Sequence, residues 1–403
     1  MRHSNARWRR RRGAGSARAG SPDRDNRWLG SALLAAVVAA PVAYPGWLAL
    51  VTARRERPAP PQPSEWPGLS VVIAAYKEAA VIGAKIDDVR GNGYPGELEI
   101  IVVADDPSTA EAARESGARV VGPGAREGKA AAVNRGIGVA TQPIVVISDA
   151  DAHLAQGSLT ALAQWFADPR IGAVAGEKQV AGVGQSLYWR VESWIKDRES
   201  RLGTTIGLVG ELAAVRRSVF RPLPRDTAVD DLWMALDVIE GGLQVHYDGD
   251  ATAVETGAPL AAEWERRTRT QAGLLDLLWR RRKLLLPWRS PVAGQLWGHK
   301  LLRSVVGPLA HAMLLARATV FFRRSLASRV FVLLHLATVL EVIRSARGAK
   351  LSRTEQTAVQ ILFLQATALG AMRRYLSGDR PASWPKPERA ERSAEVFGAN
   401  GQP

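Results

Sequence analysis

The sequence predicts an α/β fold, in which helices cover a mostly parallel sheet and further apolar helices precede and follow it. Three short runs rich in valine and isoleucine have the composition of buried parallel strands, at residues 69–76, 98–104 and 143–151. Helices are expected over residues 78–89, from about Ser108, and over residues 128–139. This alternation is typical of a doubly wound sheet, in which ligands bind at the carboxyl ends of the strands.

The charge distribution indicates a membrane rather than a nucleic acid as partner. The 403 residues include 54 lysines and arginines against 39 aspartates and glutamates. The basic residues come in bursts beside apolar stretches, at residues 9–12, 54–57, 280–283 and 323–324. Such bursts are typical of segments that contact anionic lipid, so membrane lipids are expected partners and nucleic acid is not. The absence of cysteine excludes disulfides and cysteine-bound zinc, and it fits a reducing compartment.

The N-terminal region divides into three parts by composition. Residues 1–27 are polar and arginine-rich and are expected to be a disordered tail. Residues 28–53 carry no charge and are long enough for a transmembrane helix, which Pro41 and Pro45 would kink. Residues 54–67 form a basic, proline-rich linker. A cleaved signal peptide is the alternative, but the apolar run is too long and lacks a clear cleavage site.

The α/β domain is predicted to cover residues 68–290, after which the sequence is apolar and basic. Membrane-spanning or interfacial helices are expected within residues 291–376, with candidates at residues 296–316, 330–343 and 359–372. Because the last two candidates are short, two of the three can lie in the interface; a soluble helical domain is the alternative. Residues 377–403 are expected to be a second disordered tail.

Polar clusters follow the three predicted strands, and the sheet topology should bring them together. They are Tyr76-Lys77-Glu78, Asp105-Asp106 with Ser108, and Asp149-Ala150-Asp151. Two carboxylates one residue apart at a strand end repel each other unless a cation lies between them. Asp149 and Asp151 therefore predict a site for a hard divalent ion, Mg or Mn. The alternatives are a solvated turn for this pair and a helix cap for Ser108.

Six motifs in order resemble those of the family 2 glycosyltransferases, particularly membrane-bound bacterial members related to polysaccharide synthases. The motifs read VVIAAYKE, VVADDPSTAEA, GKAAAVNRGI, SDAD, GLVGELAAVRRSVF and AVDDLWMALDVIEGG. They lie between about Leu69 and Gly273, with weaker agreement through the C-terminal helices. In the second motif, Pro107 replaces the usual glycine and Ala110 replaces the usual acid. The resemblance implies a GT-A fold and a metal-dependent, inverting hexosyltransferase.

The resemblance also implies a role for each matching residue. Asp151 would be the main metal ligand, with Asp149 near the metal or the ribose, and Asp231 would be the catalytic base. The other substrate-binding positions would be Tyr76, Glu78, Asp105, Asp106, Lys129 and Asp230. A helix N-terminal cap is the alternative for Asp230 and Asp231. The helix dipole is expected to lower the pKa of Asp231, so that desolvation on acceptor binding must restore its proton affinity.

One motif of the processive members of the family is only partly present. Where they carry QxxRW, this chain has Arg266 in place of glutamine and Thr270 in place of tryptophan, while Arg269 is retained. Arg269 is expected to bind the diphosphate, because a guanidinium can form two parallel hydrogen bonds to a phosphate. An interfacial anchor is the alternative for this arginine cluster. The sequence thus leaves single and processive transfer both open.

The expected function is transfer of a sugar from a nucleotide-sugar, such as a UDP-sugar, to a glycan or lipid-linked acceptor. We expect a multi-pass protein of the plasma membrane, with a cytoplasmic catalytic domain, acting in cell-envelope or exopolysaccharide synthesis. The alternatives are a nucleotidyltransferase and a non-catalytic membrane scaffold. Basic residues flank both ends of the first apolar segment, so two topologies remain: a single span with residues 9–12 outside, or a hairpin bent at Pro41 and Pro45.

Overall fold

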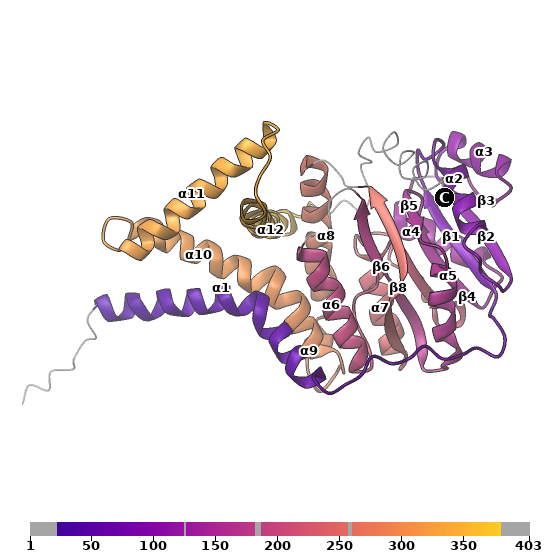
Figure 1. Cartoon of the computed structure of the whole chain (residues 1–403), viewed down its shortest axis with the longest axis horizontal. Helices are drawn as coiled ribbons and strands as arrows, with labels where there is room; N and C mark the ends of the chain where they lie inside the picture. The colour runs from indigo at the N-terminus through magenta and orange to yellow at the C-terminus, as the bar shows by residue number, and fades with distance from the viewer. Residues whose placement is uncertain (1–21, 125, 182–186, 257–259, 380–403) are drawn as a thin grey trace, which may run out of the picture.

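The computed structural model describes residues 22–124, 126–181, 187–256 and 260–379 (Figure 1). An α/β domain occupies one side of the molecule, and a group of helices projects from its other side. Residues 1–21 and 380–403, which cover most of the two predicted tails, lie outside the described residues. The first helix begins at Pro22, so residues 22–27 are helical rather than disordered as predicted.

The α/β domain is built on one eight-stranded sheet with the order β3-β2-β1-β4-β7-β6-β8-β5. The strands are β1 Leu69–Ala75, β2 Leu98–Ala104, β3 Arg119–Val121, β4 Ile144–Asp149, β5 Ala152–Leu154, β6 Ile171–Ala181, β7 Leu212–Arg216 and β8 Gln244–Thr256. β1 pairs in parallel with β2 and β4, as the sequence predicts. β7 runs antiparallel to β4 and β6, so the complete sheet is mixed but mostly parallel.

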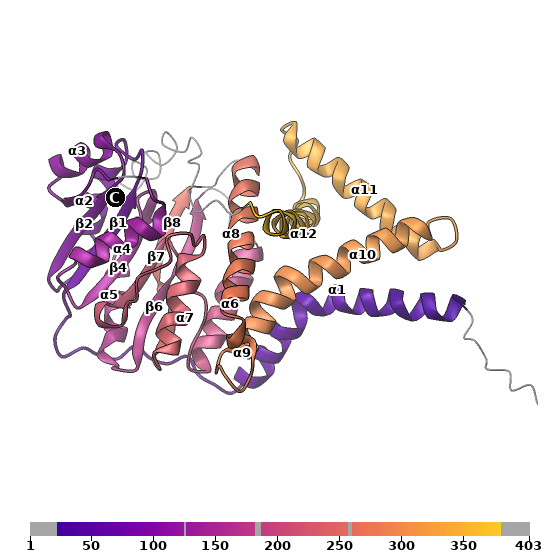
Figure 2. The same cartoon turned by 180° about the vertical axis from the view of Figure 1, so that it is seen from behind.

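Helices cover both faces of this sheet (Figure 2). They are α2 Ile82–Arg90, α3 Pro107–Glu115, α4 Lys129–Val139, α5 Ser158–Ala163, α6 Leu187–Arg201, α7 Asp230–Glu240 and α8 Leu260–Arg280. Side chains alternate along a strand, so Val71 and Val72 enter different hydrophobic clusters on opposite faces. α4 and α7 complete one cluster, whereas α2, α3 and α5 complete the other.

Several predicted elements need correction at their ends. α2 begins at Ile82 rather than at Glu78, because the main chain first turns: Val81 N–H and Ile82 N–H both donate to Glu78 O. α3 is capped by Asp106 rather than by Ser108, since the Asp106 side chain accepts a hydrogen bond from Thr109 N–H. β2 matches its predicted bounds, and α4 begins one residue later than predicted.

The helical extension consists of helices from both ends of the chain. It contains α1 Pro22–Thr52, α9 Ala293–Gln295, a π-helix at Leu296–Val306, α10 Gly307–Val320, α11 Leu326–Ala346 and α12 Arg353–Leu376. α1 is one continuous helix with Pro41 and Pro45 inside it, which contradicts the hairpin alternative. Figure 1 shows this helix bent rather than straight, as expected for internal prolines.

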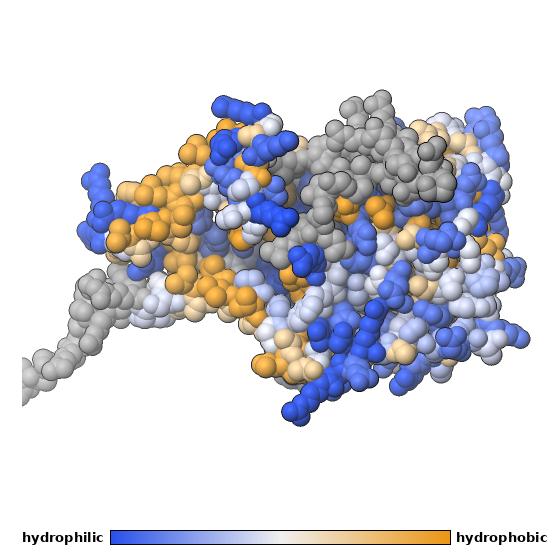
Figure 3. All heavy atoms as spheres, viewed as in Figure 1, coloured by the Kyte–Doolittle hydropathy of each residue, from blue (hydrophilic) through white to orange (hydrophobic). Residues whose placement is uncertain are grey.

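Two helices of the extension are long and apolar enough to cross a membrane, judged by length and composition alone. They are Trp28–Thr52 within α1 and Leu326–Ala346, which is α11. Hydrophobic surface gathers on the extension, whereas the α/β domain is mostly polar on the face shown in Figure 3. α12 instead packs against α8 of the α/β domain, where Arg374 forms an ion pair with Glu265 (2.6 Å).

A buried polar cluster joins α1 to the α/β domain. The Tyr44 hydroxyl donates to Glu199 on α6 (2.8 Å), and His299 of the π-helix lies between Glu199 (3.0 Å) and Glu192 (2.9 Å). Leu48 packs beside this cluster against Ile195. Because these groups come from three separate helices, they fix the end of α1 against the domain that carries the candidate site.

Candidate active site

The predicted metal-binding pair lies at the carboxyl end of a central strand. Asp149 is the last residue of β4, and Asp151 follows in the turn to β5. Lys129, the first residue of α4, brings its Nζ to 2.6 Å from Asp149 Oδ1 and donates to Gly210 O (3.3 Å). Asp149 and Lys129 therefore belong to one site, although they come from different segments of the sequence.

A buried lysine that the sequence gave no reason to select supports the turn that carries these carboxylates. Lys85 of α2 is fully buried and donates a hydrogen bond from Nζ to Ala152 O (2.5 Å). It also lies 3.6 Å from Asp88. Burial lowers the pKa of Lys85 to about 8, against the opposing effect of Asp88. Through this hydrogen bond to Ala152 O, Lys85 holds the β4–β5 turn in place.

A second group of predicted residues lies where β1 and β2 end. Asp106 Oδ2 accepts from Lys77 N–H (2.6 Å), and its Oδ1 accepts from Thr109 N–H (3.0 Å). Burial alone would raise the pKa of Asp106, but these hydrogen bonds lower it. Asp105 forms an ion pair with Arg135, yet burial raises its pKa. These carboxylates therefore have structural partners besides any substrate.

The turn after β1 combines an aromatic ring with a strained main chain. The Arg126 guanidinium lies 4.2 Å from the centroid of the Tyr76 ring. Lys77 has a φ of 56°, and it is the one non-glycine with positive φ in the described part of the chain. Glu78 is buried, and its N–H donates to Thr109 Oγ1 (2.9 Å). Strain of this kind persists at ligand sites because the surrounding structure enforces it.

The two aspartates that include the predicted catalytic base lie at the start of a helix but do not cap it. Asp230 and Asp231 are the first residues of α7, but the N-cap position is Val229, whose side chain makes no cap hydrogen bond. Asp231 Oδ1 accepts from Leu232 N–H (2.7 Å). The alternative interpretation of this pair as a helix cap is therefore wrong.

The expected direction of the Asp231 pKa shift is also wrong. Burial and the neighbouring charge of Asp230 raise the pKa of Asp231 to about 6, although the helix start was expected to lower it. The fold itself supplies the desolvation that the sequence assigned to acceptor binding. A carboxylate with this pKa is mostly ionised at neutral pH and still has a higher proton affinity than an exposed aspartate.

Lys129 links the two carboxylate pairs. Burial alone would lower its pKa, but the charges of Asp149, Asp230 and Glu211 raise it. These three carboxylates come from the end of β4, the start of α7 and the residue before β7. The structure thus brings the Lys129 ammonium group near both the predicted metal-binding pair and the pair that contains the predicted catalytic base.

Glu211 belongs to a second ion-pair network at the edge of the site. Lys178 of β6 is buried and contacts Glu211 Oε1 and, at 2.6 Å, Glu255 Oε1 of β8. Burial would raise the pKa of Glu211, but Lys178 lowers it to about 2. Asp231 and Glu211 are therefore suited to different tasks, because their surroundings shift their pKa values in opposite directions.

The donor atoms at the β4 end fit a hard divalent cation. Within the described residues, no three histidine or carboxylate side chains form a complete metal cage. Mg²⁺ and Mn²⁺ do not need one at a nucleotide site, since one or two carboxylates and the substrate phosphates complete their coordination. Asp149 and Asp151 provide such a partial set. Burial and the charges of Glu211 and Asp151 raise the pKa of Asp149, and a bound cation would favour its ionised form.

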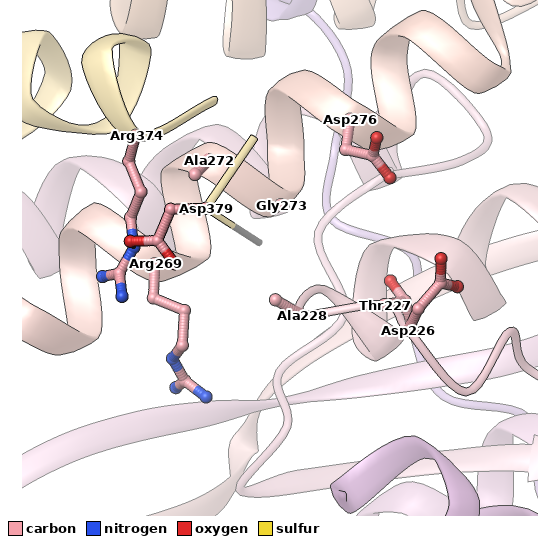
Figure 4. A pocket seen from close by; sticks show the side chains of 9 residues that line it. All are labelled: Asp226, Thr227, Ala228, Arg269, Ala272, Gly273, Asp276, Arg374 and Asp379. Atoms are coloured by element: carbon pink, nitrogen blue, oxygen red, sulfur yellow. The ribbon is translucent and has the colours of Figure 1, made fainter. Parts of the chain in front are cut away.

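Arg269 lies in a cavity between α8 and α12, beside the loop that leads to α7 (Figure 4). Its side chain is buried, which contradicts the alternative of an interfacial anchor. Burial lowers the pKa of Arg269 to about 10, while Glu265 and Asp230 oppose this shift. Arg266, in contrast, hydrogen-bonds to Glu263 on its own helix (2.9 Å). The structure thus places Arg269 near the Asp230 side of the site; its contact with a diphosphate remains a prediction.

Known proteins share both the sequence pattern and the fold. Residues 70–223 match glycosyl transferase family 2, and the match ends before Asp230. A mannosyltransferase from Pyrobaculum calidifontis, solved with GDP-mannose and Mn²⁺, is similar in structure, with a TM-score of 0.72 and 25% identity. The similarity covers 87% of this chain and 99% of that one.

Two curated relatives are similar over shorter stretches. An N-acetylglucosaminyltransferase of Rhizobium meliloti (strain 1021) is 25% identical over 62% of this chain and 67% of its own length. A beta-monoglucosyldiacylglycerol synthase of Synechocystis sp. (strain PCC 6803) is 30% identical over 31% of this chain. That alignment spans only 28% of the synthase.

The mixed sheet, its strand-end site and the similar structure define a glycosyltransferase with the GT-A fold. More particularly, residues 70–223 match glycosyl transferase family 2, which confirms the resemblance found in the sequence.

Proposed function

We propose that this enzyme is an inverting, metal-dependent transferase that moves a sugar from a nucleotide-sugar to a glycan or lipid-linked acceptor at a membrane. The observation that carries the proposal is that Lys129 forms an ion pair with Asp149 and also lies close enough to Asp230 to be affected by its charge. It unites the strand-end carboxylates and the helix-start carboxylates in one site. Leaving-group stabilisation and proton removal require such groups on opposite sides of the reacting carbon.

The nucleoside part of the donor is assigned to the ends of β1 and β2. This edge of the sheet carries Tyr76, Glu78, Asp105 and Asp106. Two hydrogen bonds hold its main chain in place, from Lys77 N–H to Asp106 and from Glu78 N–H to Thr109. Lys129 provides positive charge beside the diphosphate. Arg269 is assigned to bind the same diphosphate. Asp149 and Asp151 would hold a Mg²⁺ or Mn²⁺ ion, which neutralises charge on the departing nucleotide.

Asp231 is assigned as the general base. It accepts the proton of the acceptor hydroxyl as that oxygen forms its bond to the anomeric carbon and the bond to the diphosphate breaks. Attack from the side opposite the leaving group inverts the configuration. The raised pKa of Asp231 suits this role, because a base works best when its pKa lies near the working pH.

The membrane assignment is based on the exposed apolar helices of the extension. α1 and α11 have the length and composition of spans, and basic residues lie beside them. The Synechocystis relative is named for a glucosyldiacylglycerol product, which supports a lipid acceptor. A UDP-sugar or another nucleotide-sugar is made in the cytosol, so we assign the catalytic domain to the cytoplasmic face of the plasma membrane.

A donor panel tests the proposed activity. Membranes containing the full chain are supplied with UDP-glucose, UDP-N-acetylglucosamine or GDP-mannose, with MnCl₂, MgCl₂ or EDTA, and nucleotide release is measured. We expect release from one donor that depends on the metal and increases when total membrane lipid is added. Release of pyrophosphate instead of a nucleoside diphosphate would contradict sugar transfer.

The absence of cysteine makes the topology directly testable. Single substitutions Asp87→Cys on α2 and Asn26→Cys, at the start of α1 before its apolar part, place one thiol on each side of the proposed membrane. In intact cells, an impermeant maleimide should label Asn26→Cys but not Asp87→Cys. Equal labelling of both thiols would contradict the proposed orientation.

A further inference from the structure

The network of Glu211, Lys178 and Glu255 is organised differently from an ordinary buried ion pair. Lys178 is 1% exposed, whereas the side chains of Glu211 and Glu255 are 13% and 10% exposed. Each carboxylate directs Oε1 at the lysine. The ammonium is therefore sealed beneath two carboxylates that are more accessible than it is.

A neighbouring ion pair shows how a purely structural carboxylate is satisfied in the same fold. Glu177, also on β6, accepts from Ser193 Oγ on both oxygens (2.6 and 2.7 Å), and its Oε2 also accepts from Tyr247 (2.8 Å). Glu211 Oε2, in contrast, has no hydrogen-bond donor within the part of the chain that the structure describes. Lys178 therefore fixes the Glu211 carboxylate and leaves one oxygen available.

Glu211 lies beside the proposed reaction site rather than elsewhere on the surface. Gly210 O, one residue before Glu211, accepts a hydrogen bond from Lys129 (3.3 Å), and Glu211 O accepts from Ser148 Oγ (3.0 Å). Lys129 in turn contacts Asp149. Glu211 is thus connected through Gly210 and Lys129 to the metal-binding carboxylate Asp149, near the part of the site proposed for the sugar ring.

An aromatic ring completes the chemistry of a carbohydrate site. The Trp189 ring of α6 is half-buried, and its centroid lies 5.0 Å from Lys178 Nζ. A fixed carboxylate oxygen accepts hydrogen bonds from sugar hydroxyls, and an aromatic face packs against the apolar side of a sugar ring. Lys178 holds both groups at the same edge of the site.

We propose that Glu211 binds a hydroxyl group of a sugar ring, and that Lys178 positions this carboxylate for that purpose. The inference rests on the proposed sugar transfer and deepens it by naming a residue that selects the substrate. Hydroxyls of the donor sugar and of a sugar or polyol acceptor have the same chemistry, so both are candidates. The motif GLVGELAAVRRSVF contains Glu211, but no motif joins it to Lys178 and Glu255, because the three residues come from different strand regions.

The test compares Glu211→Gln and Lys178→Met with the wild-type full chain. The assay uses whichever of UDP-glucose, UDP-N-acetylglucosamine and GDP-mannose the wild type consumes, and it measures KM, kcat and the Kd of the matching nucleoside diphosphate with Mn²⁺. Glu177→Gln is the matched control, because it changes a buried carboxylate of the same sheet that has other partners. Thermal unfolding of each variant establishes that it is folded.

Loss of the hydroxyl contact should raise a substrate KM about 10- to 100-fold, with nucleoside diphosphate Kd changed less than about twofold. If the donor sugar is bound, KM rises for hydrolysis of the donor in water as well as for transfer. If the acceptor is bound, donor hydrolysis stays normal and only the acceptor KM rises. A deoxy analogue lacking the contacted hydroxyl should lose affinity for the wild type but not for Glu211→Gln.

Two results would overturn the inference. One is an unchanged KM for donor and acceptor in both folded variants. The other is an equal loss of nucleoside diphosphate binding, which would assign the network to support of the metal site. Failure of Lys178→Met to fold leaves Glu211→Gln as the deciding variant. Absence of nucleotide release by the wild type would instead contradict the proposed function, so the two failures are distinguishable.

Discussion

The α/β domain and the helical extension differ in how far they bury their apolar side chains. Val71 and Ile101 in the sheet are 0% exposed, whereas Leu336 and Leu340 on α11 are 55% and 60% exposed. In the sheet, helices on both faces remove the side chains from water. In the extension, no other element of the described structure covers most of the leucines of α11.

Under the proposed membrane assignment, this difference separates a region that covers its own apolar surface from one that needs a second apolar phase. Burial contributes about 25 cal/mol for each Å² of apolar surface removed from water, so an uncovered leucine gains little from the fold itself. A bilayer provides the missing cover for a helix of this length. The two regions remain one unit because Tyr44 and Leu48 of α1 are buried against α6.

The largest expected effect is a loss of turnover caused by a change in the α/β domain, with no change in membrane anchoring by the extension. Asp151→Ala should reduce metal-dependent turnover about 10,000-fold or more, because both the leaving-group charge and donor binding lose support. Thermal unfolding and the membrane-bound fraction should stay unchanged. Nucleotide release in saturating MnCl₂ measures the effect, and Asp87→Ala on exposed α2 is the control. Undiminished release would contradict the metal assignment.

The next effect distinguishes the two carboxylate pairs within the α/β domain. Asp231→Asn keeps the size of the side chain but cannot accept a proton, so transfer should fall on the order of 1,000-fold. Donor affinity should persist, because the nucleotide residues lie on other elements. Donor Kd and transfer rate are measured together, with Glu240→Gln at the other end of α7 as control. Near-normal transfer would move the role to Asp230, and equal loss of both quantities would make Asp231 structural.

A smaller effect tests the extension alone. Leu336→Asp places a charge near the middle of α11, and such a charge costs about 2.5 to 3.5 kcal/mol in membrane insertion. The insertion equilibrium should therefore shift about 100-fold, while thermal unfolding of the α/β domain is unchanged. Extraction by alkaline carbonate measures the shift, and Leu336→Ala is the control. Identical extraction of both variants would contradict a membrane position for this face.

The smallest effect concerns pH. A base must be ionised, so transfer should fall about tenfold for each pH unit below the Asp231 pKa of about 6 and level off above it. The raised pKa places this limb higher than an exposed aspartate would place it. The pH profile of kcat/KM between pH 4.5 and 8 measures the effect, with thermal unfolding recorded at each pH. A rate that stays constant down to pH 4.5 would exclude Asp231 as the titrating base.

Much of the fold was predictable because its signals are local. The β-branched run at residues 98–104 became β2 with the same bounds, and residues 128–139 became α4 with one residue removed. The structure also placed Asp149 near Lys129, a residue that the family resemblance had assigned to the same site. The antiparallel β7 was missed, because the strand pairing of a short run depends on neighbours far away in the sequence.

By itself, the sequence determined the alternation of strands and helices, the family motifs and the candidate carboxylates, since these follow from periodicity and from residue types a few positions apart. Only the tertiary structure decided that Val229 rather than Asp230 occupies the N-cap, that burial raises the Asp231 pKa, and that Lys178 holds Glu211. Burial and charge pairing depend on distances between segments remote in sequence. The fold creates these distances, and no local pattern encodes them.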